Sequence, residues 1–361
     1  MSMTPRERIL ATLDRRPVDR LPVDLWHTPE IGAALRAHCG VATDLDVYRA
    51  LKLDKIVWVF MDYRTDVGER AGAQSGAGAE SGGSRTMWGV PLKDVEAGAA
   101  HYAEFGEAPL AGFDTAASLD DYAWWPAVDR FDYDGAVAKA REAAGEFAVI
   151  GPWVSFFEIY CQMRGLEQSM MDLALDPDYV DAVLDRIEAI QTEMMKRFFV
   201  RAKGALDLVF ISDDIAGQTN LIMSPEMWAR HLQPRMRRWC DLVHAHGLRV
   251  FYHTDGAARQ LLRPIVDCGI DVLNPIQHAC PGMDLAELKA EFGREVIFHG
   301  AVDNQSVLPF GSPDDVRAET RRCLETLGAG REGFICCSCH NVQAGTPVAN
   351  VLAMIETVQG S

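Results

Sequence analysis

Two segments of the chain place metal-binding or proton-transferring side chains at the end of an apolar run. Residues 249–256 read Arg-Val-Phe-Tyr-His-Thr-Asp-Gly, so His253 and Asp255 end a pattern typical of a buried strand. Residues two apart on a strand point the same way, so this imidazole and carboxylate can converge on one cation or exchange a proton. The alternative for the pair is a hydrogen bond that ties the strand to the loop after it.

The second segment lies about eighty residues downstream and combines thiols with an imidazole. Residues 334–341 read Phe-Ile-Cys-Cys-Ser-Cys-His-Asn, again an apolar run that ends in polar groups. With the first segment, it can supply two imidazoles and a carboxylate, or a softer set with thiolates that suits Zn²⁺. The predicted metal ligands are His253, Asp255 and His340, with Cys337 and Cys339 as alternatives.

Acids and amides follow other apolar runs. Asp213 and Asp214 end the run 207–214, and Gln218 follows them, while Glu158 follows the run 147–152. Two adjacent acids at the end of a buried strand are costly unless they are solvated, paired or bound to a metal. We expect at least one to face a pocket; the alternative is a helix N-cap or a salt bridge in a loop. The residues predicted to orient or line a substrate are Glu158, Asp213, Asp214 and Gln218.

Eight apolar runs of strand type, most of them separated by helical patterns, predict the fold. Their continuous Val, Ile, Leu and Phe content is typical of parallel strands that are buried on both faces. We predict an α/β protein, a (β/α)₈ barrel forming one domain over residues 1–361, with a doubly wound sheet as the alternative. The runs are Leu21–Trp26, Lys55–Phe60, Phe147–Pro152, Asp207–Asp214, Arg249–Gly256, Val272–Gln277, Val296–Asp303 and Phe334–Asn341.

Helices are expected between these runs. Residues 178–203 carry apolar side chains at helical spacing. Ser224-Pro225 and Ser312-Pro313 each place a serine N-cap before a proline at the first helical position. In such a barrel the active site forms at the carboxyl ends of the strands, which is where the residues singled out above stand.

One connection is longer than a barrel requires. Residues 61–146 separate the second and third runs, and we predict an insertion or lid region there. Residues 68–84 are rich in glycine and poor in apolar side chains, and so predict a flexible excursion or the loop of a hairpin. No Gly-Lys-Ser/Thr follows, so these glycines do not form a phosphate loop.

Composition narrows the class of protein. The 361 residues carry a net charge of −17, which argues against nucleic-acid binding, since that requires clustered Lys and Arg. No apolar run reaches the roughly 20 residues of a membrane helix, and no signal-peptide pattern opens the chain. Nine cysteines without an extracellular signal favour reduced thiols and a cytoplasmic location.

Several spaced motifs make nearly the whole chain, from about Thr4 to Val358, resemble the uroporphyrinogen decarboxylase-like superfamily. The resemblance is closest to its bacterial branch related to corinoid-dependent methyltransferases, and it implies a (β/α)₈ barrel. The matching segments are residues 6–9 (Arg-Glu-Arg-Ile), 17–23 (Pro-Val-Asp-Arg-Leu-Pro-Val), 213–214 (Asp-Asp), 221–226 (Leu-Ile-Met-Ser-Pro-Glu), 271–277 (Asp-Val-Leu-Asn-Pro-Ile-Gln), 340–343 (His-Asn-Val-Gln) and 346–347 (Thr-Pro).

In the methyltransferase branch, a His-X-Cys after strand 5 and a Cys near the end of strand 8 hold Zn²⁺. There the metal binds a thiol substrate, and the resulting thiolate takes a methyl group from a corrinoid. The resemblance places His253 at the family's histidine, but Asp255 stands where a cysteine is expected. The second cysteine position falls at His340, with Cys339 beside it. The site would be harder than the family's thiolate-rich one.

The decarboxylase itself binds a polycarboxylate macrocycle through arginines after strand 1. Residues 24–31 read Asp-Leu-Trp-His-Thr-Pro-Glu-Ile and contain none, which disfavours porphyrinogen decarboxylation. The leading hypothesis is a zinc-dependent methyltransferase that moves a methyl group between a corrinoid on a separate protein and a small-molecule acceptor. The alternatives are metal-assisted lyase, hydrolase or decarboxylase chemistry, and a barrel that binds a ligand without catalysis. Whether the chain forms a homodimer is left open.

Overall fold

The computed structural model describes residues 3–64, 70–71, 85–97 and 100–361. Its centre is a curled parallel sheet of seven strands, in the order β1-β6-β7-β8-β9-β10-β11. Each strand coincides with one of the apolar runs, although β6 continues two residues past the end of its run, so the predicted α/β barrel architecture is confirmed. The strands are β1 (Ile56–Trp58), β6 (Ala148–Val154), β7 (Leu208–Ser212), β8 (Arg249–His253), β9 (Val272–Asn274), β10 (Ile297–Val302) and β11 (Phe334–Ser338).

The first apolar run, residues 21–26, fills the gap between the two edge strands of this sheet. Val23 pairs with Cys336 of β11 in a parallel bridge. On the other side, the backbone N–H of Asp54 donates to the carbonyl of Val23 at 2.8 Å. The run contributes an isolated bridge rather than a regular strand. It nevertheless occupies the eighth position, between β11 and the residues that precede β1.

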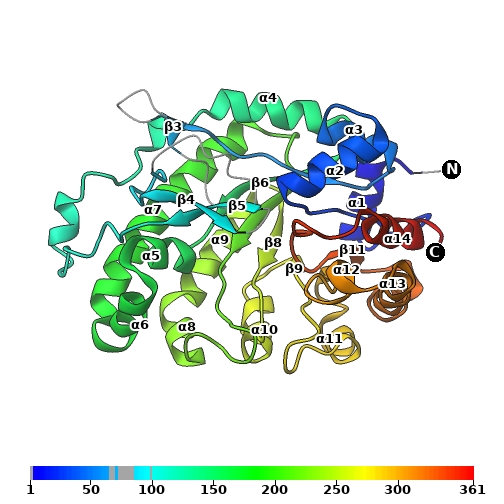
Figure 1. Ribbon diagram of the computed structural model, residues 1–361. Helices are drawn as coiled ribbons and strands as arrows, with labels where there is room; N and C mark the ends of the chain where they lie inside the picture. Colours follow the sequence, from blue (N-terminus) through cyan, green and yellow to red (C-terminus); the bar gives the residue numbers. More distant parts are fainter. Residues whose placement is uncertain (1–2, 65–69, 72–84, 98–99) are drawn as a thin grey trace.

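Helices surround the strands, and the two ends of the chain lie on the same side of the molecule, where α14 packs against α2 (Figure 1). The predicted N-caps are confirmed: Ser224 Oγ accepts from the N–H of Met227, and Ser312 Oγ accepts from that of Asp315. The helix predicted over residues 178–203 is α7. The helices are α1 (Pro5–Leu13), α2 (Pro29–Cys39), α3 (Asp44–Ala50), α4 (Tyr133–Ala144), α5 (Phe157–Arg164), α6 (Leu166–Leu175), α7 (Pro177–Arg201), α8 (Pro225–His231), α9 (Gln233–Ala245), α10 (Arg259–Val266), α11 (Leu285–Phe292), α12 (Val307–Phe310), α13 (Pro313–Leu327) and α14 (Val348–Gln359), with short 3₁₀ turns η1 (Ser118–Asp121), η2 (Val128–Arg130) and η3 (Ala329–Arg331).

Aromatic rings fill the interior of the barrel. The ring of Trp26 lies 5.4 Å from Trp58, 6.0 Å from Phe210 and 6.0 Å from Phe251, measured between centroids. These residues come from four different positions around the sheet. A closed barrel of this size has a packed core, so a substrate can be bound only at the ends of the strands.

The long connection from 61 to 146 combines added structure with an ordinary barrel helix. It holds β2 (Tyr63–Arg64) paired with β3 (Arg70–Ala71), and a hairpin of β4 (Leu92–Ala97) and β5 (Ala100–Phe105). Its last part is α4, which packs on β6 and α7 as a crossover helix does. Of the predicted excursion at 68–84, only residues 70–71 belong to the described part of the chain.

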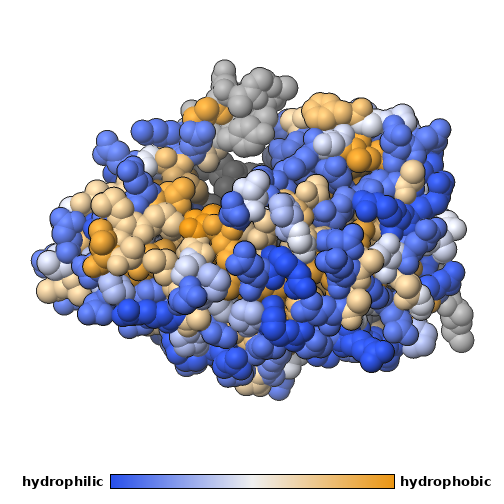
Figure 2. Space-filling view, turned by 90° about the horizontal axis from the view of Figure 1, so that it is seen from below, coloured by the Kyte–Doolittle hydropathy of each residue, from blue (hydrophilic) through white to orange (hydrophobic). Residues whose placement is uncertain are grey.

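The surface agrees with the acidic composition. Figure 2 shows a face on which hydrophilic residues predominate, with apolar residues gathered toward the side where α5, α6 and α8 lie in Figure 1. Three exposed apolar side chains, Leu166, Met171 and Leu175, belong to α6. Within the ranges that the structure describes, no helix combines the length and apolar character needed to span a bilayer.

Candidate functional site

Three of the predicted ligands meet at the carboxyl ends of the barrel strands. One ligand atom each from His253, Asp255 and His340 lies within 4.8 Å of the other two. His253 is the last residue of β8, and its Nε2 lies 3.9 Å from Asp255 Oδ2. The rings of His253 and His340 meet edge to face, with centroids 5.6 Å apart. Residues 249–256 and 334–341 therefore bring their polar side chains together at one point.

The chemistry of this cluster suits a divalent metal ion. Zinc bonds to His nitrogen and carboxylate oxygen are about 2.0–2.2 Å long, which puts ligand atoms of a tetrahedral site roughly 3.3–3.6 Å apart. The 3.9 Å between His253 Nε2 and Asp255 Oδ2 is close to that spacing. Burial lowers the pKa of His340, which favours the neutral imidazole that a metal requires. Two nitrogens and one oxygen leave further positions for substrate.

A second carboxylate faces the same imidazole. Asp214 Oδ1 lies 3.9 Å from His253 Nε2 and accepts a hydrogen bond from the backbone N–H of Asp255 at 3.0 Å. Within the described ranges, neither Asp214 nor Asp255 forms an ion pair with a lysine or an arginine. Two carboxylates that share an imidazole and no protein cation favour an added cation.

The cysteines point elsewhere. Cys337 is buried beside Asp24 and His299, and burial raises the pKa of its thiol to about 12. Cys339 is also buried, and its Sγ donates to the carbonyl of Ile276 at 3.4 Å. Thiols kept protonated by burial are poor ligands. The geometry thus brings together the nitrogen and oxygen donors of the prediction and leaves the sulfur donors apart.

The two adjacent acids at the end of β7 have different surroundings. Asp213 is buried and accepts hydrogen bonds from the Ser155 hydroxyl at 2.8 Å and from the backbone N–H groups of Phe157 and Glu158 at 2.6 and 3.1 Å. The two backbone donors belong to the first turn of α5, so Asp213 binds the N-terminus of that helix without being its N-cap residue, while Asp214 is the acid that reaches the mouth. Burial raises the pKa of Asp213 to about 7, against the effect of these hydrogen bonds.

Glu158 stands in the first turn of α5 and accepts a hydrogen bond from the Ser212 hydroxyl. Burial, together with the negative charges of Asp214 and Asp213, raises its pKa well above the ordinary value. The protonated form of this side chain is therefore favoured up to a higher pH than in an ordinary glutamate. A protonated carboxyl beside a polar pocket is suited to act as a general acid.

Gln218 lies on the exposed rim. Its Oε1 accepts from Gln277 Nε2 at 2.8 Å, and Gln277 Oε1 accepts from the backbone N–H of Gly256 at 2.9 Å. These contacts tie together the loops that follow β7, β8 and β9. Gln218 thus stabilises the rim on which Asp214 and Asp255 stand.

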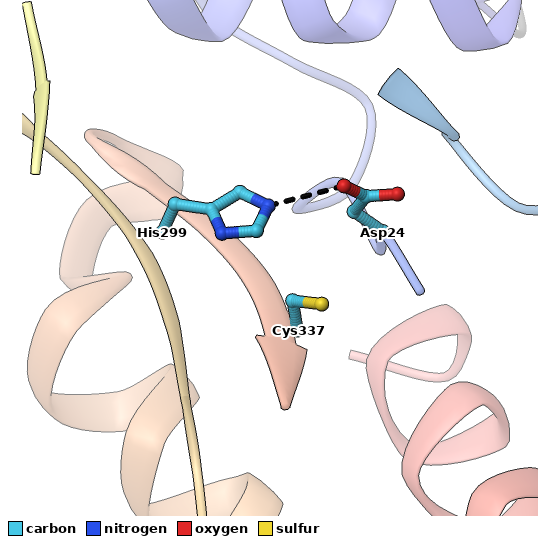
Figure 3. A group of neighbouring side chains, drawn as sticks. All are labelled: Asp24, His299 and Cys337. Carbon is cyan, nitrogen blue, oxygen red and sulfur yellow. Dashed lines mark hydrogen bonds and ion pairs between the residues drawn. The ribbon is translucent and has the colours of Figure 1, made fainter. Parts of the chain in front are cut away.

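A buried polar cluster below the mouth was not predicted from the sequence. Figure 3 shows His299 and Asp24 pointing at each other, with Cys337 to one side and no interaction drawn to it. His299 Nε2 lies 3.1 Å from Asp24 Oδ2, and Lys55 Nζ donates to Asp24 Oδ1 at 2.9 Å. Asn274 joins this cluster to the mouth. A lysine and an aspartate inside apolar runs were the available signal, since such charges are buried only when paired.

The chain is similar to a known protein family and to a solved methyltransferase structure. The family model described as uroporphyrinogen decarboxylase (URO-D) matches residues 130–361. The solved structure of a methyltransferase from Methanosarcina mazei superposes with a TM-score of 0.70 at 18% identity, covering 99% of both chains. This likeness confirms the fold of the whole chain, including the part before residue 130.

Two other solved structures give weaker matches. A psychrophilic family 10 endo-β-1,4-xylanase gives a TM-score of 0.37 at 14% identity, covering 58% of this chain and 71% of its own. A 3-keto-D-glucoside 4-epimerase from E. coli gives 0.37 at 11% identity, covering 65% and 86%. Curated protein sequences include no match to this chain.

Proposed function

We propose that this chain, a member of the uroporphyrinogen decarboxylase family, is a metal-dependent methyltransferase. It would move a methyl group between a corrinoid, carried by a separate protein, and a small-molecule acceptor. The observation that supports this proposal best is the His253, Asp255 and His340 cluster, which faces the barrel mouth without a lysine or arginine partner in the described residues. We assign these three side chains as ligands of Zn²⁺.

The metal would act as a Lewis acid that binds the acceptor and lowers its pKa, which makes it a better nucleophile. The side chains of the protein would hold the reactants in place. His253 and His340 would hold the metal through ring nitrogens, and Asp214 would orient the acceptor opposite them. Glu158 would donate a proton to, or hydrogen-bond with, the bound substrate. Asp213 would act indirectly, because it holds the start of α5 that carries Glu158.

The ligand set also affects which acceptor can bind. Asp255 stands where the similar methyltransferases have a thiolate. A carboxylate donates less electron density to the metal than a thiolate does, so the site prefers harder ligands. We therefore propose that acceptors with oxygen or nitrogen groups are used at least as well as thiols. The reaction would be tested by following transfer from methylcobalamin to a panel of alcohols, amines and thiols.

The first experiment is a metal analysis of the purified protein. We expect about one zinc per chain, loss of methyl transfer on chelation, and recovery when zinc is added back. His253→Ala should lose the metal, whereas Cys339→Ala, a matched change of a buried residue at the same end of the barrel, should keep it. A protein without bound metal whose activity survives chelation would contradict the proposal.

One observation favours a second candidate, metal-assisted lyase, hydrolase or decarboxylase chemistry. Burial and the nearby charge of Asp214 raise the pKa of Glu158 and favour its protonated form, an arrangement suited to proton donation during bond cleavage. Turnover of a single substrate without any corrinoid would identify this chemistry. Tight binding of a ligand with no turnover by either route would indicate a barrel that only binds.

A further inference from the structure

A continuous hydrogen-bonded chain runs from the barrel core to the mouth. Lys55 Nζ donates to Asp24, and His299 Nε2 lies 3.1 Å from the other oxygen of Asp24. His299 Nδ1 lies 2.8 Å from Asn274 Nδ2, and Asn274 Oδ1 lies 2.6 Å from His253 Nδ1. Asp24, His299 and Asn274 have no solvent-exposed surface.

The donors of this chain can be assigned from its buried end. Burial opposes ionisation of Asp24, but Lys55 and His299 outweigh it and hold the pKa of Asp24 below its usual value. A carboxylate only accepts hydrogen bonds, so His299 Nε2 is the donor. Burial also lowers the pKa of His299, so its ring has one proton and its Nδ1 must accept. The amide nitrogen of Asn274 donates to that Nδ1.

The same logic determines the state of the metal ligand. With its nitrogen turned to His299, the Asn274 side chain presents its oxygen to His253, so His253 Nδ1 is the donor. We propose that Asp24, His299 and Asn274 are positioning residues that hold His253 as the Nδ1–H tautomer, leaving the Nε2 lone pair free to bind a metal at the mouth. This proposal rests on the proposed metal site. It identifies the residues that keep His253 in the form that can bind the metal.

An amide at the centre of the chain has a specific consequence. Metal-bound histidines usually donate their second N–H to a carboxylate or a carbonyl, which sets the tautomer and the ring orientation. Here Asn274 accepts in the same way but brings no charge, and an amide does not pass a proton along. The buried Asp24 therefore orients His253 at a distance without exchanging protons with it.

Gly300 makes room for this arrangement. Its φ of +96° lies in the left-handed region, and an added Cβ would lie 3.4 Å from Asn274 Nδ2 and 3.3 Å from the carbonyl of Ser338. A larger residue here would strain the backbone and crowd the amide that turns His253. The local backbone is thus compatible with only a small residue beside Asn274.

The tautomer can be read by nitrogen-15 NMR of the histidines in metal-free protein. In the wild type we expect a protonated Nδ1 and an unprotonated Nε2 for His253. Asn274→Leu should give a mixture of tautomers and weaken zinc binding about 10- to 100-fold, the usual effect of losing such a partner. Asn304→Leu changes an asparagine that does not take part in these hydrogen bonds. It should change neither the tautomer of His253 nor the zinc affinity.

A second variant keeps the proposal testable if Asn274→Leu does not fold. Asn274→Asp retains an acceptor for His253 but loses the donor to His299, so the tautomer of His253 should persist while the His299 signals shift. A wild-type His253 protonated on Nε2, or an unchanged tautomer in Asn274→Leu, would overturn the proposal. Because the NMR readout needs no metal, a protein that binds no zinc would reject the metal site and leave this test intact.

Discussion

Two clusters in the barrel each combine histidine with aspartate but differ in how the charge of the aspartate is balanced. The inner cluster joins His299 to Asp24 with Cys337 beside them, and the mouth cluster joins His253 to Asp255 and His340. The inner cluster is fully buried and includes Lys55, whose ammonium group pairs with Asp24 at 2.9 Å. No lysine or arginine in the described ranges pairs with the carboxylates at the mouth.

The presence of suitable ligand side chains therefore does not by itself define a metal site. A buried carboxylate needs a partner of opposite charge, and the inner cluster has one from the protein. The third group of potential ligands, His278, Glu319 and Cys323, is like the inner one, because Arg322 lies 2.9 Å from Glu319 and 3.1 Å from His278. Among the residues that the structure describes, only the mouth cluster of these three lacks a lysine or arginine partner.

The largest expected effect is the loss of folding stability when the inner cluster loses its lysine. Lys55→Met would leave Asp24 buried without its cation, and we expect the free energy of unfolding to fall by about 3–5 kcal/mol. Urea denaturation followed by circular dichroism measures this. Lys139→Met removes a surface ion pair with Asp62 and should cost less than about 1 kcal/mol. Equal effects of the two variants would show that the inner lysine is not required to balance the charge.

The next prediction concerns the mouth. His253→Ala should lower zinc affinity by at least about 100-fold and abolish methyl transfer, because it removes one of three protein ligands. Isothermal titration calorimetry with zinc gives the affinity. Cys337→Ser should leave the affinity within about threefold of the wild type, as its thiol lies in the inner cluster. A large loss in Cys337→Ser would mean that the two clusters share a metal.

A third prediction tests the proton on Glu158. Since its pKa is raised, activity should fall as pH rises through that value, because the protonated form is lost. Glu158→Gln keeps a neutral side chain of the same size, so it should remove this alkaline limb and lower kcat about 100-fold or more. The pH profile of kcat measures both. An unchanged profile in the variant would assign the limb to another group.

A fourth prediction concerns Asp213, a buried carboxylate held by neutral donors rather than by a cation. Its pKa is raised to about 7, whereas an unfolded aspartate titrates near about 3.9. The native state therefore binds more protons between these values, and the contribution of Asp213 to stability is lost as pH rises through about 7. Relative to the wild type, Asp213→Asn should gain up to about 4 kcal/mol from pH 4 to 8, since the two pKa values differ by about 3 units. Denaturation at several pH values measures this, and a constant difference would contradict it.

Much of the fold could be predicted because it depends on local patterns. Apolar runs bounded by polar residues located the strands, and Ser224 and Ser312 marked two helix starts. The pair His253 and Asp255 was visible because residues two apart on a strand share a face. The run 21–26 was harder, since its pairing with Cys336 depends on closure of the sheet rather than on its own sequence.

The sequence alone therefore determined which side chains stand at strand ends, because alternation and apolar runs are properties of neighbouring residues. It left open whether thiols or imidazoles complete the cluster, and which of Asp213 and Asp214 faces the mouth. Tertiary structure decided both, because His340 and Asp255 lie 85 residues apart in the numbering and meet only across the closed barrel. It also supplied the link from Lys55 to His253, since that chain is made of contacts between separate strands.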